Sequence, residues 1–383
     1  MFGSRGSCKN FKDMCIYIYI MILMLLCLGS NKSEINENTK FHLLCIVLFL
    51  FFAFKDGSVG NDSIAYINFF LNKSSMYGTI NNPAFEGDRG FVIFSRLISY
   101  ISHTEFFFIL SYTILALTPV YILFKKYAIS KVNAVCFSFV LYGIYSIYLI
   151  NFRQVLSVSC IIIAYLLYNN IKNKKYKYCL TILFAFIAAS FHSTAFIVIP
   201  IMLLLHIPFH ISKRTAYIII LGSYLIFFLS TTILSNIMSI VFEFLNLVDL
   251  SRMSTYQNNF DNMSSDVIAN ISWTSVTAYS LLGLIFIYSL SSVNIDNFFE
   301  KSFLFSIVAY NLFAQFGLSI RLFYIFVIFG VCAIPLLKGK TMIKWAYILL
   351  FVSYIFANYK ILAPAVLKGH GASDIIPYTF IFE

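Results

Sequence analysis

The chain has 383 residues, of which 60% are hydrophobic and only 11% are charged. Soluble domains carry roughly 25% charged residues, so this composition excludes an ordinary soluble domain. The net charge of +11 does not indicate a nucleic-acid-binding protein, because the lysines fall in short loops between apolar runs. The apolar runs are continuous rather than alternating, which favours membrane helices over a β-barrel.

In chain order, the apolar runs predict an all-α fold, a polytopic transmembrane helical bundle of about 12 spans. No A-x-A-like cleavage site follows the first run, so we interpret it as a span rather than a signal peptide. The expected spans are 14–29, 41–54, 105–124, 132–150, 154–169, 178–191, 194–206, 215–231, 272–291, 302–315, 320–336 and 344–358.

Lysine-rich loops alternate with lysine-poor loops along the chain. The positive-inside rule places the lysine-rich loops in the cytoplasm. We therefore predict a single multi-pass membrane domain over residues 1–383. It has two larger extracytoplasmic segments, 55–104 and 232–271, and an extracytoplasmic tail, 359–383.

The first outer segment begins with a turn-rich stretch, Gly57–Tyr66, which leads into an expected helix. The stretch lacks the Lys-Ser/Thr ending of a phosphate-binding P-loop. Asp62 and Tyr66 are four residues apart and would share a helix face. In the alternative interpretation, Asn61 or Asp62 caps the helix. Further on, 90–101 is apolar but too short to span a membrane, so we expect an interfacial or re-entrant helix there.

Leu149–Gln154 is a short polar interruption between two long apolar runs. Its arginine, Arg153, is costly in this setting unless something binds the guanidinium. The functional interpretation is an anion site, in which the guanidinium holds a phosphate or carboxylate. The alternative is an arginine that snorkels to lipid phosphates at a helix end.

Two further polar residues are expected at the same depth as Arg153. His192 stands in a break between two apolar runs and is either structural or a base or hydrogen-bond donor. Arg321 lies at the start of an expected span and is either functional or a helix-end anchor. Together the three residues favour a shared outer cavity.

Several kinds of site have no motif in the sequence. There is no Walker motif, HExxH, GxSxG or DxD cluster, and the eight cysteines show neither CxxC nor zinc-ligand spacing. Charges inside the expected spans are nearly absent, which argues against ion-coupled transport through a chain of carboxylates.

The ordered motifs resemble the EpsG/Wzy-type family of membrane polysaccharide polymerases, which includes O-antigen and capsule polymerases. The matching pieces are Val59-Gly-Asn-Asp62 with Tyr66, Glu86-Gly-Asp-Arg-Gly90-Phe91, Asn151-Phe-Arg153-Gln154, Phe191-His192-Ser-Thr-Ala195, Arg321-Leu-Phe-Tyr324 and Ile376-Pro-Tyr378. They follow the order of the family's elements along almost the whole chain. The Glu86 element carries two more residues than the family pattern E-x-G-F.

The resemblance implies glycosyl transfer outside the cytoplasmic membrane, from a glycan on undecaprenyl pyrophosphate to a new lipid-linked repeat unit. Neither a metal nor a nucleotide or other cofactor is expected. Candidate partners are the bilayer, the lipid-linked oligosaccharide, and the flippase and chain-length regulator of the pathway. The candidate catalytic residues are His192, Arg153 and Asp62, and the candidate substrate-binding residues are Arg321, Gln154, Tyr66, Tyr324, Glu86 and Arg89.

Three other functions stay open at this point. A flippase or exporter of lipid-linked oligosaccharides would need a charged central cavity, for which the intramembrane charges are few. Another lipid-linked glycosyltransferase or ligase would use the same outer cavity and the same donor. In a structural subunit of an export complex, the outer arginines would be dispensable.

Overall fold

The computed structural model describes residues 36–72, 88–141, 144–229, 273–290, 294–313 and 317–334. The predicted spans 14–29 and 344–358, the outer segment 232–271 and the tail 359–383 lie outside the described residues. Within them the chain is mostly helical, as the sequence predicted. The described residues up to Ile201 form one compact unit, and those from Met202 to Ala333 form a second.

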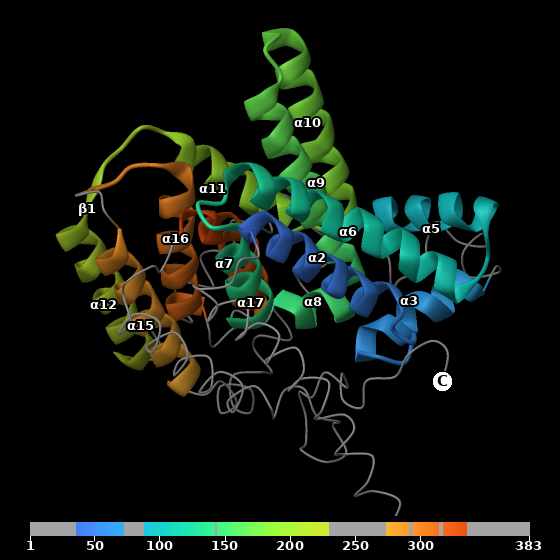
Figure 1. Cartoon of the computed structure of the whole chain (residues 1–383), viewed down its shortest axis with the longest axis horizontal. Coiled ribbons are helices and arrows are strands. Elements are labelled where there is room, and N and C mark those ends of the chain that lie inside the picture. The colour runs from blue at the N-terminus through green and yellow to red at the C-terminus, as the bar shows by residue number, and fades with distance from the viewer. Residues whose placement is uncertain are drawn as a thin grey trace, which may run out of the picture. The chain divides into compact units, whose positions relative to one another are not determined.

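Figure 1 shows the helices coloured along the chain. The first unit contains α2 (Glu37–Ala53), α3 (Asn61–Leu71), α5 (Arg89–Ile101), α6 (Glu105–Tyr127), α7 (Lys131–Cys136), the π-helical segment η2 (Phe137–Leu141), α8 (Ile144–Ile150), α9 (Phe152–Asn170) and α10 (Lys174–Phe191). Helix α11 (Ala195–His206) runs from the first unit into the second. The second unit contains β1 (Ile211–Ser212), α12 (Lys213–Leu229), α15 (Trp273–Ser289), β2 (Asn294–Ile295), α16 (Phe298–Phe313), α17 (Gly317–Gly330) and the 3-10 turn η4 (Val331–Ala333).

The predicted spans within the described residues coincide with helices, with ends that differ by a few residues. The predicted span 132–150 is not regular α-helix throughout: it contains α7, the π-helical η2 and α8, and residues 142–143 between η2 and α8 lie outside the described residues. Among the described helices, α6 and α9 are long and apolar enough to cross a membrane by themselves. The number of spans and their orientation stay predictions.

One end of the first unit gathers the loops that were predicted to be cytoplasmic. The Ser130 hydroxyl, which caps α7, donates a hydrogen bond to the Glu37 carboxylate at the start of α2, at 2.9 Å. Near the same end, the Lys126 ammonium donates to the Asn170 side chain, so the ends of α6 and α9 meet. The lysine-rich loop that follows α6 therefore lies near the start of α2 and near the end of α9.

The core of the first unit is built around Phe152, the first residue of α9. Its ring is fully buried and stacks on Tyr112 of α6, with ring centroids 4.1 Å apart. On another side it stacks on Tyr66 of α3, at 5.3 Å. Aromatic pairs of this kind are worth about 0.5–1.5 kcal/mol each beyond the area that they bury. They fix the start of α9 against two other helices.

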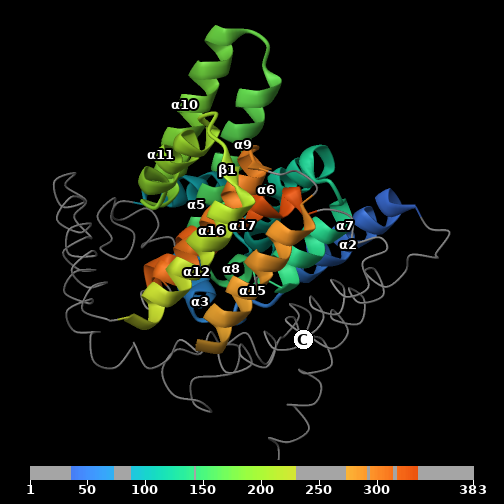
Figure 2. The ribbon, with the colours of Figure 1, turned by 90° about the vertical axis from the view of Figure 1, so that its left-hand side faces the viewer.

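In the second unit, α12, α15, α16 and α17 pack against one another. Figure 2 shows α12, α15 and α16 side by side. Buried Asn311 of α16 connects three of these helices: its amide donates to Ser223 of α12 at 2.9 Å and accepts from Ser280 of α15 at 3.1 Å. The antiparallel β1–β2 pair was not predicted, since two-residue strands leave no hydropathy pattern.

Candidate functional site

The predicted polar interruption is a break between α8 and α9. Helix α8 ends at Ile150, and Asn151 leaves helical geometry with φ −101° and ψ 68°. In a continuous helix the carbonyls of Tyr148 and Leu149 would accept from backbone N–H groups four residues on. Here the Tyr112 hydroxyl donates to the Tyr148 carbonyl at 2.7 Å. The break is thus held open by side chains from other helices.

The second of these carbonyls is satisfied in the same way. The hydroxyl of Ser63, from α3, donates to the Leu149 carbonyl at 2.7 Å. Ser63 is itself fully buried. Buried backbone carbonyls need such partners, because an unsatisfied one costs about 1–3 kcal/mol. The geometry of Leu149–Gln154 is therefore fixed from outside the segment.

Arg153 lies in the first turn of α9, just after the break. Its Nε donates to the Tyr66 hydroxyl at 3.1 Å, and its guanidinium forms an ion pair with Asp88. The guanidinium carbon also lies 5.3 Å from the centre of the Tyr66 ring. The Arg153 side chain keeps 20% of its surface exposed, whereas the Asp88 side chain keeps 5%. The structure thus presents an oriented and partly open guanidinium.

His192 ends α10 at the same level as Arg153. One turn deeper, the Ser157 hydroxyl of α9 donates to the Ala188 carbonyl of α10 at 2.8 Å. Arg153 precedes Ser157 by four residues and His192 follows Ala188 by four, so both residues lie at the same end of this antiparallel pair. Figure 1 shows α9 and α10 side by side.

The imidazole of His192 is oriented by the turn that follows it. The backbone N–H of Thr194 donates to His192 Nδ1 at 3.2 Å, and the Thr194 hydroxyl lies 3.0 Å from the same nitrogen. Because a backbone N–H can only donate, Nδ1 accepts, and a neutral ring carries its proton on Nε2. Of the two chemical roles that the sequence left open for His192, a base and a hydrogen-bond donor, this arrangement favours the donor.

The start of α5 approaches the end of α10 very closely at Gly90. A Cβ atom at Gly90 would lie 2.4 Å from the Ser190 hydroxyl oxygen and 3.0 Å from the Phe191 backbone nitrogen. Only glycine allows this approach without a shift of the backbone. The contact places Asp88, just before α5, beside the chain that leads to His192. It also gives the glycine of the Glu86–Phe91 motif a physical role.

The site therefore brings together residues from four separate motifs of the first unit. Arg153, Tyr66 and Asp88 are in direct contact, and His192 lies at the level of Arg153. Asp88 was not among the predicted site residues. Asp88 lies inside the Glu86–Phe91 motif, so the sequence did point to it. The two extra residues in that motif obscured whether Glu86 or Asp88 belongs to the site.

The other predicted site residues are placed as follows. Asp62 is exposed in the first turn of α3, whereas Tyr66 is buried, so their side chains do not share one environment. Gln154 is buried beside Arg153, and Arg89 is exposed. The alternative in which Asn61 or Asp62 caps α3 is wrong: the N-cap is Gly60, with φ 93° and no side-chain cap bond.

Three predicted residues belong elsewhere. Glu86 lies outside the described residues. Arg321 and Tyr324 are in α17 of the second unit, and the Tyr324 side chain is half-buried. The predicted cavity shared by Arg153, His192 and Arg321 stays a prediction for that reason.

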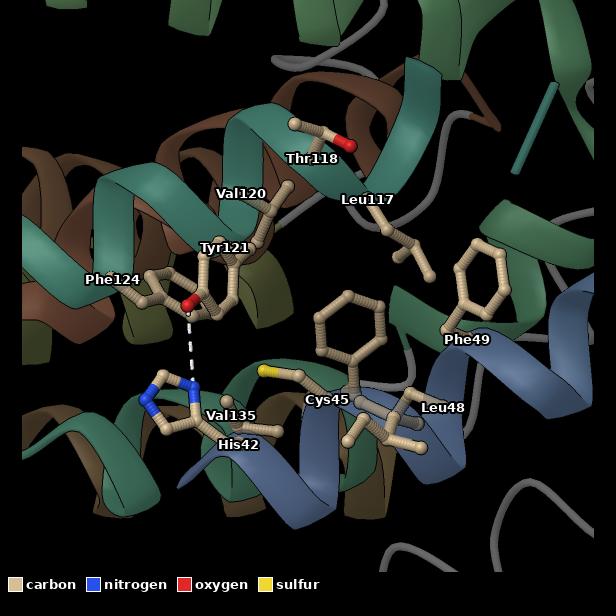
Figure 3. A pocket seen from close by; sticks show the side chains of 12 residues that line it. His42, Cys45, Leu48, Phe49, Leu117, Thr118, Val120, Tyr121, Phe124 and Val135 are labelled. Atoms are coloured by element: carbon tan, nitrogen blue, oxygen red, sulfur yellow. Dashed lines mark hydrogen bonds between the residues drawn. The ribbon is translucent and has the colours of Figure 1, made fainter. Parts of the chain in front are cut away.

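A separate cavity of about 420 Å³ lies between α2, α6 and the α7–η2 segment (Figure 3). Its lining is apolar apart from a few groups, among them His42 and Tyr121, which are joined by a hydrogen bond of 3.2 Å. It lies along the second half of α6, whereas Phe152 packs on the first half at Tyr112. The cavity is thus distinct from the site around Arg153. Among the described residues, no cluster of three His, Cys, Asp or Glu could hold a metal.

In the described part of the chain, two helices are long and apolar enough to cross a membrane, and a polar site lies at the start of one of them. The family model of the EpsG family matches residues 38–380, so the chain belongs to the EpsG family. This confirms the resemblance found in the motifs, and it indicates a polymerase-type function in polysaccharide biosynthesis. The chain matches no curated protein and no solved structure.

Proposed function

We propose that this protein polymerises lipid-linked oligosaccharide repeat units into a surface polysaccharide on the outer face of the cytoplasmic membrane. The donor is a growing glycan on undecaprenyl pyrophosphate, and the acceptor is a hydroxyl of a new lipid-linked repeat unit. The observation that carries the proposal is the Arg153 guanidinium, held by Asp88 and Tyr66 and partly open, in a chain of the EpsG family.

In the reaction, the acceptor hydroxyl oxygen attacks the anomeric carbon of the donor. The bond from that carbon to the pyrophosphate oxygen breaks, and its electron pair leaves with the lipid pyrophosphate. Negative charge therefore develops on an oxygen that Arg153 can bind. A hydrogen-bond donor directed at an oxygen that gains charge stabilises the transition state more than the ground state. Such a group typically raises the rate by ~10²–10³. Asp88 keeps the guanidinium in place, because it fixes one nitrogen of the fork.

His192 can donate a second hydrogen bond to the same leaving pyrophosphate. Its Nδ1 accepts from Thr194, so the neutral ring donates from Nε2. The proton of the acceptor hydroxyl then needs another base, for which exposed Asp62 is the candidate. Arg321, Tyr324, Gln154, Glu86 and Arg89 remain proposed substrate contacts. The energy of the bond comes from the activated donor, so the proposal requires no metal and no nucleotide.

The test is glycan profiling of a deletion strain complemented with variants. Arg153→Ala should insert normally and yield single capped repeat units in place of long chains. Arg153→Lys is sharper: an ammonium cannot reproduce the fork that joins Tyr66 and Asp88, so the long chains should also be lost. A snorkelling anchor would tolerate lysine, and normal chain length in both variants would refute the proposal.

The same experiment separates the alternatives. Loss of a flippase leaves lipid-linked repeat units on the inner face of the membrane, whereas loss of a polymerase leaves them capped singly outside. The proposal further expects association with the flippase and chain-length regulator of the same pathway, which crosslinking in native membranes would detect.

A further inference from the structure

Lys55 is a fully buried lysine at the start of the first outer segment, after the end of α2. Its ammonium donates to the Leu149 carbonyl at 2.5 Å, to the Ser63 hydroxyl at 2.8 Å and to the Val59 carbonyl at 3.3 Å. The three acceptors match the three N–H donors of an ammonium. A neutral amine could satisfy only two of them.

The position of this charge has a physical cause in the break between α8 and α9. Leu149 is the penultimate residue of α8, and the carbonyl end of a helix carries partial negative charge. Within the described part of the chain, Lys55 forms no ion pair with a carboxylate. The helix end and the Ser63 hydroxyl take the place of a counter-ion. Lys55 therefore stabilises the break between α8 and α9, and its buried side chain is not accessible to a substrate.

A short chain of contacts leads from Lys55 to the candidate site. The ammonium lies 4.6 Å from the centre of the Phe152 ring. Phe152 immediately precedes Arg153 in the sequence. Phe152 stacks on Tyr66, and the Tyr66 hydroxyl accepts from Arg153. Lys55 thus holds both the last turn of α8 and the first residue of α9. A cation over an aromatic face is attracted by the negative charge of the ring face, and the attraction is strongest where water is excluded.

We infer that Lys55 is a positioning residue that sets the orientation of the Arg153 guanidinium through the Leu149 carbonyl and the Phe152 ring. The catalytic consequence of this role rests on the proposed function. Lys55 itself touches neither substrate nor the reacting atoms, since its side chain is buried.

The site thereby depends on the protonation of Lys55. Burial lowers the pKa of Lys55 to about 7, against the opposing effects of Glu105 and Asp56. The ammonium therefore loses a proton within an accessible pH range. Because the neutral amine has only two N–H donors, one of the three hydrogen bonds is then lost. Glu105 and Asp56 act on Lys55 electrostatically, and the surrounding helices also carry Asp62, Tyr66, Tyr112, Tyr148 and Arg153.

The test uses the full-length protein in proteoliposomes, with the lipid-linked repeat unit extracted from the deletion strain as substrate. Lys55→Met should lower kcat by about 10-fold to 100-fold with little change in KM, because displacement of a positioned group by about 1 Å costs up to ~10² in rate. Lys55→Arg keeps a charge that does not titrate, so it should restore activity in part and remove the alkaline decline of the wild type.

A second readout needs no substrate and no polymerase activity. Phenylglyoxal modifies exposed arginines, and peptide mass spectrometry measures its rate at Arg153 in native membranes. Lys55→Met should raise that rate several-fold, since a displaced guanidinium leaves the cover of Tyr66 and Asp88. An unchanged rate together with unchanged kcat overturns the inference, even where Arg153→Ala abolishes polymerisation. Normal polymerisation by Arg153→Ala instead overturns the proposed function.

If Lys55→Met does not accumulate in the membrane, the Ser63→Ala variant tests the role of Lys55 instead. It removes one acceptor of the ammonium in a buried site with little change of volume. The charged form of Lys55 is then less stable, so the alkaline decline of activity should move to lower pH. A wild-type profile that stays flat from about pH 6 to 9, or a decline that Ser63→Ala leaves unmoved, overturns the inference.

Discussion

The Ser157 hydroxyl donates to the Ala188 carbonyl at 2.8 Å and thereby fixes the register of α9 against α10. Both residues are buried, so the contact is not displaced by water. It sets the level at which α9 begins and α10 ends, and so it brings Arg153 and His192 to one end of the helix pair. Residues on α9 and α10 thus form one polar region through a contact one turn below it.

Asp88→Asn should weaken polymerisation without loss of the protein. The amide oxygen still accepts from the Arg153 guanidinium, but the charge-assisted bond becomes an ordinary one, which costs about 1 kcal/mol. We expect a rate about tenfold lower, since the guanidinium is less firmly oriented. Chain-length distribution on gels and kcat in proteoliposomes measure it.

The chain offers a matched control for this variant. His210 and Asp296 form the other close contact between a basic and an acidic side chain among the described residues, at 2.6 Å, and both side chains are largely exposed. Exposed pairs contribute little, about 0–1 kcal/mol. Asp296→Asn should therefore leave chain length unchanged. Equal effects of the two substitutions would contradict a special role for Asp88.

His192→Asn tests whether the imidazole acts on the substrate or only shapes the turn. An asparagine side chain can accept from the Thr194 N–H as Nδ1 does, so the turn should persist. The donor at Nε2 is lost, and we expect a fall in kcat of about 10²-fold. Normal thermal stability with wild-type kcat would show that His192 is structural.

The positions of the helices were predictable because the apolar runs are long and continuous. The exception, residues 132–150, shows the limit of that signal. Hydropathy does not record backbone hydrogen bonding, so an α-helix and the π-helical segment that follows it, such as α7 and η2, read as one apolar run. The polar residues that mark the break were visible, but not what holds it open.

The candidate site was predictable in part for a related reason. Arg153 stood out because it interrupts an apolar sequence, and Tyr66 because it belongs to a motif. Asp88 and Lys55 did not, since both lie in a segment that reads as polar and exposed. Their burial depends on contacts across 65 and 94 residues of sequence, to Arg153 and to Leu149. Such contacts leave no local pattern.

Gly90→Ala should displace α5 from α10. The added Cβ meets the Ser190 side chain and the backbone of 190–191, and backbone cannot move aside cheaply. Overpacking of this kind costs about 1–3 kcal/mol. We expect a lower thermal midpoint in detergent, together with shorter glycan chains, because Asp88 moves with α5.

Gly222→Ala is the control for Gly90→Ala. Gly222 lies inside α12, and no atom lies within 4 Å of the position that its Cβ would take, so alanine fits without contact. Alanine in a helix interior is favoured over glycine by roughly 0.5–1 kcal/mol. The thermal midpoint of Gly222→Ala should therefore equal that of the wild type or be slightly higher. A fall equal to that of Gly90→Ala would show that neither effect comes from the approach of α5 to α10.

The stability of the protein should rise with pH over the range in which its activity falls. Lys55 has a pKa of about 7 in the folded state against an ordinary value of 10.5. Between these values the unfolded chain binds a proton that the folded one does not, so the free energy of unfolding increases with pH, by up to about 1.4 kcal/mol per unit. Below about pH 7 both states are protonated and this contribution stays constant.

Lys55→Met removes the titrating amine, so the free energy of unfolding of the wild type should rise relative to that of the variant as the pH rises from about 7 to 9. Unfolding in mixed micelles at several pH values measures it. Polymerisation by the wild type should decline over the same range, because the ammonium loses a hydrogen bond to the break before Arg153. General alkaline damage would lower stability and activity together, whereas the titration of Lys55 moves them in opposite directions. Parallel stability curves for the two proteins would contradict the assignment.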